Sequence, residues 1–195
     1  MKSFSQACEN NKDPILSKLK VYLADVSEVL EIGSGTGQHS VYFAANLPHL
    51  QWYTSDLPEH HQGILAWHQE AGLENLHPPV KLDLNDPWPI NTVDAIFTAN
   101  TLHIISLQLV KRFFEGVGKH LRQQGQLCIY GPFNYQGQFT SESNQRFDSF
   151  LKQRDPQSGI RDAELIEDLA AQAGLHLLKD IAMPANNRLL IFKRQ

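Results

Sequence analysis

The chain has 195 residues, of which 42% are hydrophobic and 19% are charged, and this composition fits one globular domain with one sizeable core. The net charge is -4 and no basic block is present, so we do not expect a nucleic-acid partner held mainly through its phosphates. No apolar run approaches the roughly 18 residues of a membrane span, and residues 1–14 lack the apolar core of a signal peptide. We therefore expect a cytoplasmic protein with no membrane partner.

The sequence contains alternating apolar runs and helical patterns, which predict a parallel sheet flanked by helices. In chain order, the first elements expected are a helix at 14–26, a strand at 28–32, a helix at 38–46, a strand at 51–56, a helix at 58–71, strands at 79–84 and 93–100, a helix at 107–121 and a strand at 125–133. The last are a helix around 147–151, a helix at 163–173, and strands at 175–182 and 188–194. Asp13, Ser106 and Asp162 are the expected N-caps. The connection at 183–187 is too short for a crossover helix, so we expect the last two strands to be antiparallel.

The first expected strand runs into a glycine loop with the sequence VLEIGSGTGQH. Its glycines have G-x-G-x-G spacing, and Gln38 stands where a dinucleotide fingerprint has its third glycine. Glu31, two residues before the first glycine, would repel an anion and attract a cation. S-adenosylmethionine carries a sulfonium and an ammonium but no phosphate, and glycines allow the backbone to approach it closely. The loop therefore favours S-adenosylmethionine, with S-adenosylhomocysteine as product, over a pyrophosphate.

Two further acids end the second and third expected strands. Asp56 lies roughly 20 residues past the loop, where a carboxylate can accept both ribose hydroxyls, although it could also simply cap the helix that Pro58 opens. Asp83 can accept the adenine amino group while Leu84 packs on the ring, or it can be an ordinary turn residue. All these candidates fall at the carboxyl ends of consecutive strands, where open α/β sheets bind ligands.

The glycine loop, the two acids and the terminal antiparallel pair resemble the class I S-adenosylmethionine-dependent methyltransferases over most of the chain. The resemblance implies a Rossmann-like α/β fold. Its seven-stranded, mostly parallel sheet would have the order 3-2-1-4-5-7-6, an antiparallel last strand and helices on both faces. It also implies that Glu31 and the loop face the methionyl part of the cofactor, Asp56 the ribose and Asp83 the adenine. The expected cofactor-binding residues are Glu31, Gly33, Ser34, Gly35, Thr36, Gly37, Asp56, Leu57, Asp83, Leu84 and Asn100.

Three other stretches narrow the resemblance. They are ENNKDPIL at 9–16, the polar stretch at 139–162, and MPANN at 183–187. Together with LEIGSGTGQH and PFNYQGQFT, they are similar to the methyltransferase-like protein 26 family over nearly the whole chain. That family is itself largely uncharacterised, so the resemblance strengthens the fold and the cofactor but adds little about the substrate.

Two residues at the end of the fourth expected strand and just beyond it are candidates for the chemistry. Methyl transfer has a good neutral leaving group, so positioning supplies much of the acceleration, and an oxygen acceptor gains from a base. His103 is the candidate base, with local packing at the helix start as the alternative. Asn100 is a candidate contact for the cofactor or the acceptor. This region lacks the Asn/Asp-Pro-Pro-aromatic motif of some methyltransferases that act on exocyclic amines of bases or on glutamine.

Residues 1–195 are expected to form a single domain, with segments 1–14 and 132–162 covering its active site. The second segment is dense in polar, aromatic and charged side chains. The candidates for substrate contact are Asn11, Asn134, Tyr135, Arg146 and Arg161. The two arginines are suited to an anionic substrate, and the alternatives are structural ion pairs in the second segment and a flexible lead-in at the N-terminus.

The cysteines and histidines do not suggest a metal site. Two cysteines cannot form a disulfide framework or a Cys-rich zinc site, and Cys128, in an apolar run, is expected to be a small buried hydrophobe. The histidines lack metal-ligand spacing and are expected to be solvated on the surface. The histidines concerned are His39, His60, His61 and His68.

The leading hypothesis is a methyltransferase that uses S-adenosylmethionine and a small-molecule acceptor. A non-catalytic S-adenosylmethionine-binding module that regulates a protein partner is the alternative, because a fold does not dictate activity. The glycine spacing and Glu31 argue against a nicotinamide-dependent oxidoreductase. The net charge and the missing motif weaken a protein or nucleic-acid methyltransferase. The sequence determines neither the acceptor nor the oligomeric state.

Overall fold

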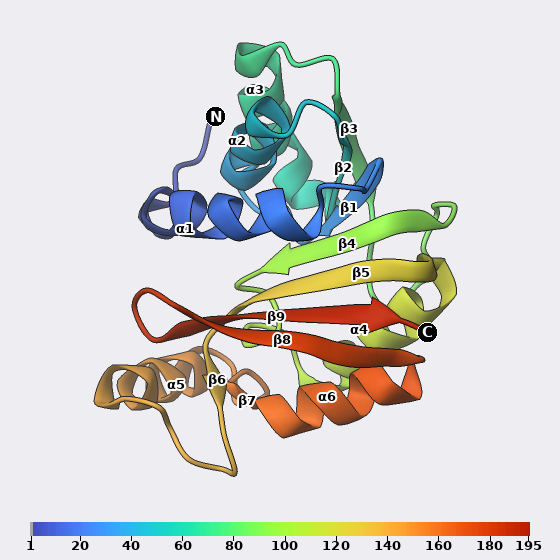
Figure 1. Cartoon of the computed structure of the whole chain (residues 1–195). Coiled ribbons are helices and arrows are strands. Elements are labelled where there is room, and N and C mark those ends of the chain that lie inside the picture. The colour runs from blue at the N-terminus through green and yellow to red at the C-terminus, as the bar shows by residue number, and fades with distance from the viewer. Residues whose placement is uncertain (1) are drawn as a thin grey trace.

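The computed structural model describes residues 2–195 as a seven-stranded sheet with helices on both faces (Figure 1). The strands of this sheet are β1 (Glu28–Ile32), β2 (Gln51–Asp56), β3 (Leu76–Lys81), β4 (Val93–Ala99), β5 (Leu121–Gly131), β8 (Leu175–Met183) and β9 (Asn187–Arg194). The helices are α1 (Gln6–Tyr22), α2 (Gln38–Asn46), α3 (Pro58–Ala71), α4 (Leu107–His120), α5 (Glu142–Arg154) and α6 (Ala163–Gln172). Four of these helices, α2, α3, α4 and α6, begin at the residues predicted.

The strand order is β3-β2-β1-β4-β5-β9-β8. The first five of these strands are parallel, and β9 runs antiparallel to both β5 and β8. Two short strands, β6 (Phe133–Asn134) and β7 (Arg161–Asp162), form a separate parallel pair that the sequence did not suggest. Without that pair the order reads 3-2-1-4-5-7-6, which confirms the class I methyltransferase fold.

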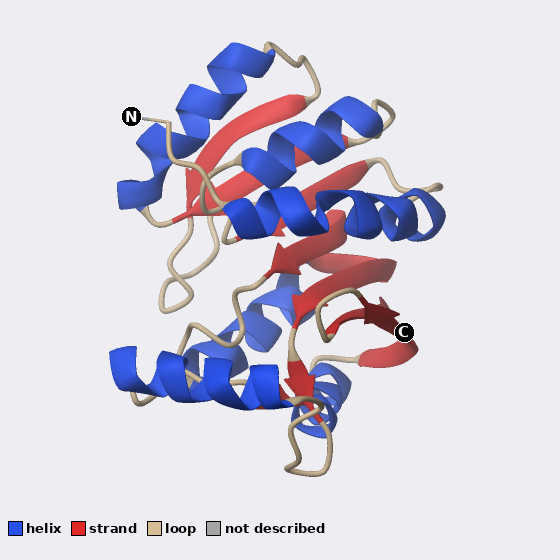
Figure 2. Ribbon diagram, turned by 90° about the vertical axis from the view of Figure 1, so that its left-hand side faces the viewer, coloured by secondary structure: helices blue, strands red, loops and turns tan. Residues whose placement is uncertain are grey.

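Both faces of the sheet are buried, because successive residues of a strand point to opposite sides. In β5, Leu127 and Ile129 pack with residues of α4 and α6, while Cys128 and Tyr130 pack with residues of α1 and α2. Cys128 is fully buried, as predicted. Figure 2 shows α1, α2 and α3 together over one face of the sheet. None of the helices formed by residues 2–195 has the length and apolar character that a bilayer crossing requires.

The first helix begins at Gln6, eight residues before the predicted start at Pro14. Ser5 is its N-cap, and the Ser5 side chain accepts a hydrogen bond from Cys8 N at 3.4 Å. Asp13, the predicted cap, lies inside the helix and accepts a hydrogen bond from the Tyr42 hydroxyl. The predicted start of this helix at Pro14 is therefore wrong, because a capping serine upstream starts the helix and the rest of the fold supports it past the proline.

The third strand lies three residues earlier than predicted. Pro78 and Pro79 are inside it, which is possible because β3 is at the edge of the sheet and its pairing with β2 shifts register beside them. Asp83 and Leu84 therefore follow the strand in a loop and do not end it. Asp83 Oδ1 accepts a hydrogen bond from Asn85 N at 2.9 Å, so this residue does form the turn that the sequence offered as an alternative.

Candidate active site

The predicted cofactor and catalytic residues gather at one edge of the sheet. The carboxyl ends of the parallel strands meet there, and β9 begins there because it runs antiparallel to β5, with Gly131 opposite Arg188. In Figure 1 this edge is on the left, beside the first turns of α1 and the turn between β8 and β9. Fold class alone therefore places the glycine loop, Asp56, Asn100 and His103 along a common edge.

The glycine loop turns sharply between β1 and α2. Gly33, Gly35 and Gly37 have φ values of 73°, 59° and 87°, in the left-handed region that favours glycine. A Cβ on Gly33 would lie 2.9 Å from Thr101 Oγ1, and one on Gly37 would lie 3.0 Å from Ile64 Cα. Around Gly35, by contrast, no atom of residues 2–195 other than those of Gly35 and its two chain neighbours comes within 4 Å of that position. The outer two glycines are required by packing, while Gly35 presents bare backbone to open space.

Asp56 is joined directly to this loop. Gly35 N donates a hydrogen bond to Asp56 Oδ2 at 2.7 Å, and Leu57 N donates to Asp56 Oδ1 at 2.7 Å. Ser34 is held by the same strand, because Ser34 N donates to Ser55 O at 3.0 Å and Ser34 Oγ accepts from Ser55 N at 3.2 Å. The structure thus brings the predicted ribose acceptor beside the glycine whose backbone is open, and each carboxylate oxygen keeps a second lone pair.

Glu31 lies beneath the loop and is only 2% exposed. Its Oε2 accepts hydrogen bonds from the Ser40 hydroxyl and, at 3.0 Å, from Trp52 Nε1. Burial raises the pKa of the Glu31 carboxyl, and the two donors offset part of that effect. Glu31 is therefore tied to α2 and β2, and its contact with the methionyl part of a cofactor stays a prediction.

Gln38 connects the loop to the start of α1. Its Nε2 donates to Glu9 Oε1 at 3.1 Å and to Ser5 O at 3.4 Å, and its Oε1 accepts from Ser5 N at 2.5 Å and from Thr36 Oγ1 at 3.1 Å. The first turn of α1 is thereby held across the end of the loop. From the sequence, Gln38 could be recognised only as the residue that replaces a fingerprint glycine. Its partners Ser5 and Glu9 lie about 30 positions away, so they leave no local pattern.

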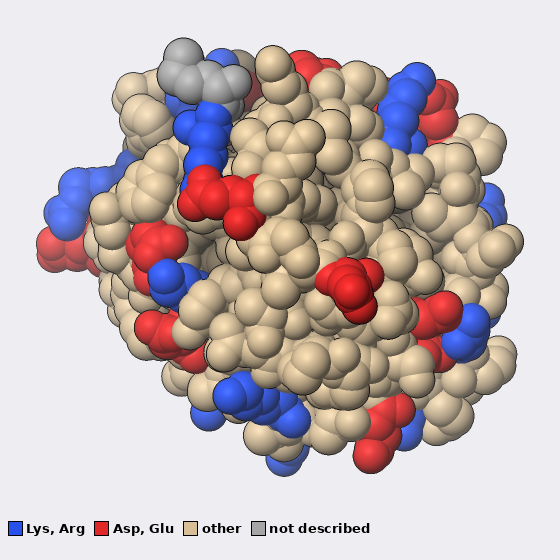
Figure 3. Space-filling model, turned by 90° about the horizontal axis from the view of Figure 1, so that it is seen from above, with Lys and Arg blue, Asp and Glu red and all other residues tan. Residues whose placement is uncertain are grey.

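Residues 2 and 3 extend these N-terminal contacts to α3. Lys2 Nζ lies 2.5 Å from Glu70 Oε2 and 3.6 Å from the centroid of the Trp67 ring, and Trp67 Nε1 donates to Ser3 O at 2.7 Å. On the face seen in Figure 3, acidic and basic side chains are interspersed. The N-terminal segment is therefore attached to both α2 and α3.

The predicted substrate residue Asn11 lies inside this contact between α1 and α2. Asn11 is 9% exposed, and its Oδ1 is 2.6 Å from His39 Nε2. His39 is 5% exposed and stacks on Phe43 with ring centroids 5.1 Å apart, and burial lowers the pKa of His39 to about 4. The prediction that His39 is solvated is wrong, because α1 covers it. Among the other histidines of that prediction, His60 is exposed and His61 and His68 are partly buried.

Asn100 and His103 converge over the end of β5. Asn100 has a φ of 56° and donates its backbone N–H to Tyr130 O at 2.9 Å. His103 Nδ1 and Asn100 Oδ1 lie 3.5 and 4.0 Å from the place that a Cβ on Gly131 would take. His103 is 5% exposed, with the Phe147 ring edge-to-face against it at 5.3 Å. Burial lowers the pKa of His103 to about 4, so the ring is neutral near pH 7, as a general base requires.

The predicted substrate residues after β5 do not converge on one point. Arg146 is on the outer side of α5, with its side chain 74% exposed and 3.6 Å from the Glu142 carboxylate. The Tyr135 hydroxyl donates to Asp180 Oδ2 at 2.6 Å, toward β8. Asn134 is buried, and its Oδ1 has no hydrogen-bond partner within residues 2–195. Arg161 lies beside the loop that carries His103 and donates to backbone carbonyls.

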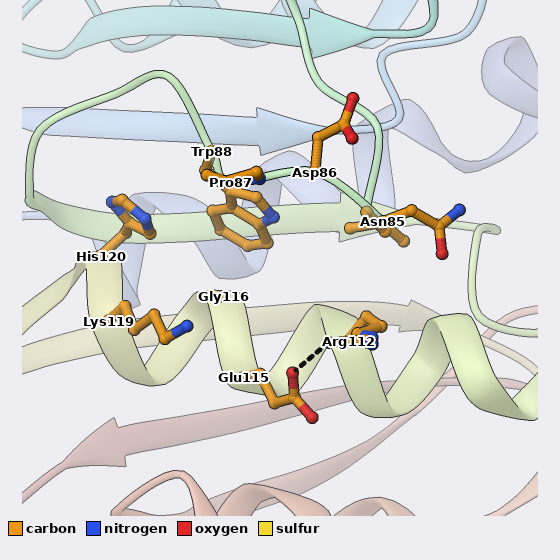
Figure 4. Close-up of a pocket in the computed structure, with 10 residues that line it drawn as sticks. Asn85, Asp86, Pro87, Trp88, Arg112, Glu115, Gly116, Lys119 and His120 are labelled. Carbon is orange, nitrogen blue, oxygen red and sulfur yellow. Dashed lines mark hydrogen bonds and ion pairs between the residues drawn. The ribbon is translucent and has the colours of Figure 1, made fainter.

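A cavity of about 310 Å³ lies away from the glycine loop, between α4 and the loop before β4 (Figure 4). The Trp88 indole stacks on His120 with centroids 5.4 Å apart, and Arg112 and Glu115 form an ion pair at 3.3 Å on its wall. Of the predicted site residues, all of which the structure describes, Leu84 alone lines it. The lining includes no residue of the glycine loop and none of Asp56, Asn100 and His103, so we regard this cavity as a feature of how α4 packs.

The chain shares its fold with solved methyltransferases. An O-methyltransferase family protein from Burkholderia thailandensis matches with a TM-score of 0.84 at 15% identity, over 94% of this chain and 56% of that one. Human N-acetylserotonin methyltransferase, in complex with S-adenosylmethionine, matches with a TM-score of 0.79 at 16% identity, over 97% of this chain and 53% of that one.

An O-methyltransferase family 2 protein from Planctomyces limnophilus, in complex with apigenin, has a TM-score of 0.77 at 16% identity and covers 94% and 62% of the two chains. The chain thus spans a little more than half the length of these structures. Identities this low show the fold and leave the activity to be argued from the site.

A family model matches residues 2–194, which is nearly the whole chain. Its description is "Protein of unknown function (DUF938)", and it assigns no activity. On this match, the chain belongs to the DUF938 family.

Proposed function

We propose that this protein is an S-adenosylmethionine-dependent methyltransferase that acts on a small-molecule acceptor. The observation that carries the proposal is the open backbone of Gly35 beside the Asp56 carboxylate, at the carboxyl edge of a class I methyltransferase sheet. The similar structures include one in complex with S-adenosylmethionine and one in complex with apigenin, which supports both the cofactor and a small acceptor.

The hydrogen bonds of the loop fit a cofactor without phosphates. A pyrophosphate site needs free backbone N–H groups that point at the ligand. Here Gly33 N and Ser34 N both donate to Ser55 O, Gly35 N donates to Asp56, and Gly37 N donates to Ser34 O. These four donors are already satisfied by the protein. What the loop offers to a ligand is bare backbone and a carboxylate, which suits a nucleoside.

Each part of the cofactor has a proposed partner. Asp56 would accept the ribose hydroxyls, with Leu57 beside it, and Asp83 and Leu84 would hold the adenine. The residues Glu31, Gly33, Ser34, Gly35, Thr36 and Gly37 would surround the methionyl part. When bound, S-adenosylmethionine supplies an electrophilic methyl group on its sulfonium.

The acceptor would lie next to Asn100 and His103. A neutral His103 ring can take the proton from a hydroxyl acceptor as its oxygen is methylated, and Asn100 can orient the acceptor or the cofactor. The resemblance to the methyltransferase-like protein 26 family, on the stretches quoted above, is part of the same proposal. So is the role of the N-terminal segment as a cover, which is supported by its bonds to Gln38 and Trp67.

Calorimetric titration with S-adenosylmethionine, S-adenosylhomocysteine and NAD tests the proposal. We expect both sulfur compounds to bind near micromolar affinity and NAD not to bind. Asp56→Asn should weaken binding about tenfold or more, because charge-assisted hydrogen bonds to the ribose are lost.

Asp25→Asn is the matched control, since Asp25 is an exposed carboxylate before β1, at the opposite edge of the sheet. It should bind like the wild type. A folded wild-type protein that binds neither sulfur compound, or that prefers NAD, would overturn the assignment.

A further inference from the structure

Arg161 directs its guanidinium at the loop that carries His103. Pairing of β7 with β6, through Arg161 and Phe133, sets the position of its backbone. Arg161 Nε donates to Leu102 O at 3.2 Å, and one terminal nitrogen donates to Ile105 O at 2.5 Å and to Gln157 O at 2.8 Å. These bonds use three of the five N–H donors of the guanidinium.

Two residues just before Arg161 in the chain bind the two carbonyls that lie between Leu102 O and Ile105 O. Gly159 N donates to His103 O at 2.9 Å, and the Ser158 hydroxyl donates to Ile104 O. Four consecutive carbonyls, from residue 102 to residue 105, therefore accept hydrogen bonds from Ser158, Gly159 and Arg161. Because every one of these carbonyls is bonded to residues 158–161, this segment fixes the course of the loop.

The segment is itself anchored on α5. Asp148 is 4% exposed, its Oδ1 accepts from Ile160 N at 2.8 Å, and its Oδ2 lies 2.6 Å from Lys152 Nζ. The residue before Asp148 is Phe147, whose ring contacts His103. Helix α5 thus reaches His103 twice, once through the aromatic ring and once through the 158–161 segment.

We propose that Arg161, with Ser158 and Gly159, is a positioning group for His103 and not an anchor for an anionic substrate. This inference rests on the proposed function, because it assigns the group that holds the candidate base. The Nε edge of the guanidinium, which would form a two-pronged contact with a carboxylate or phosphate, is occupied by carbonyls.

The positive charge of Arg161 also acts on His103, in addition to the hydrogen bonds that hold its loop. Burial and, secondarily, the positive charge of Arg161 lower the pKa of His103. The other charged residues of α5 are Asp148 and Lys152, which are paired with each other, Glu142 and Arg146, which are also paired, and Arg154, which lies over the Phe150 ring. Strand β7 also carries Asp162. Arg161 therefore favours the neutral imidazole as well as its placement.

Nuclear magnetic resonance of the labelled His103 ring in the full-length chain tests this inference. Arg161→Gln removes both the positive charge and the guanidinium that bonds the carbonyls of the loop. The His103 ring resonances should therefore shift, and the His103 titration midpoint should rise by about 0.5 pH unit or more. Arg161→Lys keeps the charge but not the guanidinium, so the resonances should shift while the midpoint stays nearer the wild-type value. Arg146→Gln is the matched control, since Arg146 is exposed and pairs with Glu142 on the same helix, and it should change neither.

Ser158→Ala removes a single hydrogen bond and covers the case in which Arg161→Gln does not fold. It should move the His103 resonances without changing their titration midpoint. Folded Arg161→Gln and Ser158→Ala proteins with wild-type His103 spectra would overturn the inference.

Titration of the same variants with S-adenosylmethionine separates this inference from the proposed function. We expect affinities within about twofold of the wild type, since the segment does not contact the glycine loop. If the wild type binds no S-adenosylmethionine, the proposed function fails, while the ring spectra still decide whether Arg161 positions His103.

Discussion

At the scale of single residues, Gly35 and Gly72 separate backbone strain from ligand contact. Both have a φ near 60° and open space where a Cβ would be, but Gly72 caps the far end of α3. Alanine at either position should lower the free energy of unfolding by about 1 kcal/mol. Only Gly35→Ala should also weaken S-adenosylmethionine binding, by about tenfold, as measured by calorimetry. Equal affinities for the two variants would mean that the ligand does not approach Gly35.

Glu31 should make stability depend on pH. Its pKa is raised in the folded protein above the ordinary value of 4.5, because the carboxyl is buried. The protonated carboxyl contributes fully to the free energy of unfolding below pH 4.5, and this contribution is lost as the pH rises through the raised pKa. The Glu31→Gln variant cannot ionise at this position and should not lose this stability. In urea titrations, the free energy of unfolding of Glu31→Gln minus that of the wild type should therefore increase from pH 5 to pH 8.

The control for this prediction is Glu74→Gln, which neutralises an exposed carboxylate. Its stability relative to the wild type should not change over the same pH range. A flat difference for Glu31→Gln as well would show that Glu31 is ionised throughout and held by Ser40 and Trp52 alone.

At the scale of elements, the start of α1 determines whether an N-terminal cover exists. If the helix begins at Gln6, with Ser5 as its N-cap, the amides of residues 9–12 are hydrogen-bonded and should exchange slowly with deuterium. Ser5→Ala removes the cap, costs about 1 kcal/mol and should speed exchange there. Asp13→Ala should leave those amides protected. The reverse pattern would support a helix that starts at Asp13.

Helix α4 depends on a single glycine for its packing. A Cβ on Gly116 would lie 2.2 Å from the Trp88 indole, while one on Gly118 would lie 3.3 Å from its nearest neighbour, Ala173 O. Gly116→Ala should therefore lower the unfolding free energy by about 2–3 kcal/mol in denaturant titrations. Gly118→Ala gains helix propensity and should stay within about 1 kcal/mol of the wild type. Two variants of equal stability would contradict this packing.

Elements with a clear hydrophobic period could be predicted from the sequence, and those set by distant partners could not. The continuous apolar run of β5 and the apolar stripe of α4 can be recognised from the local sequence. The third strand was predicted three residues too late, because its edge position, which allows Pro78 and Pro79 inside it, cannot be seen in the sequence. The pairing of β6 with β7 is two residues long and joins positions 28 residues apart, so periodicity cannot reveal it.

The residues of the candidate site also divide into those that the sequence could place and those that it could not. Residues at strand ends, such as Asp56 and His103, could be placed because fold class brings strand ends together. The partners of Gln38 and Arg161 could not, because each contacts backbone or side chains from another part of the chain. Composition identified Arg161 as a charge near the site, but only the structure showed that its donors are already used.

For the whole molecule, two buried histidines should limit stability in acid. His39 and His103 each have a pKa lowered to about 4 from 6.5, because burial disfavours the cation. Between these values the unfolded chain binds more protons, so stability is complete above pH 6.5 and falls as the pH decreases toward 4. At pH 5 each histidine should cost up to about 2 kcal/mol.

Glu31 acts in the opposite direction, since it destabilises the fold as the pH rises. Maximal stability should therefore lie between the two effects, and urea midpoints at pH 5, 6 and 7 can locate it. The double variant His39→Gln/His103→Gln should lose less stability than the wild type between pH 7 and 5, whereas His60→Gln, at an exposed position, should lose as much. If the double variant and the wild type lose equal amounts, other groups control acid unfolding, and these two rings are not held neutral by burial.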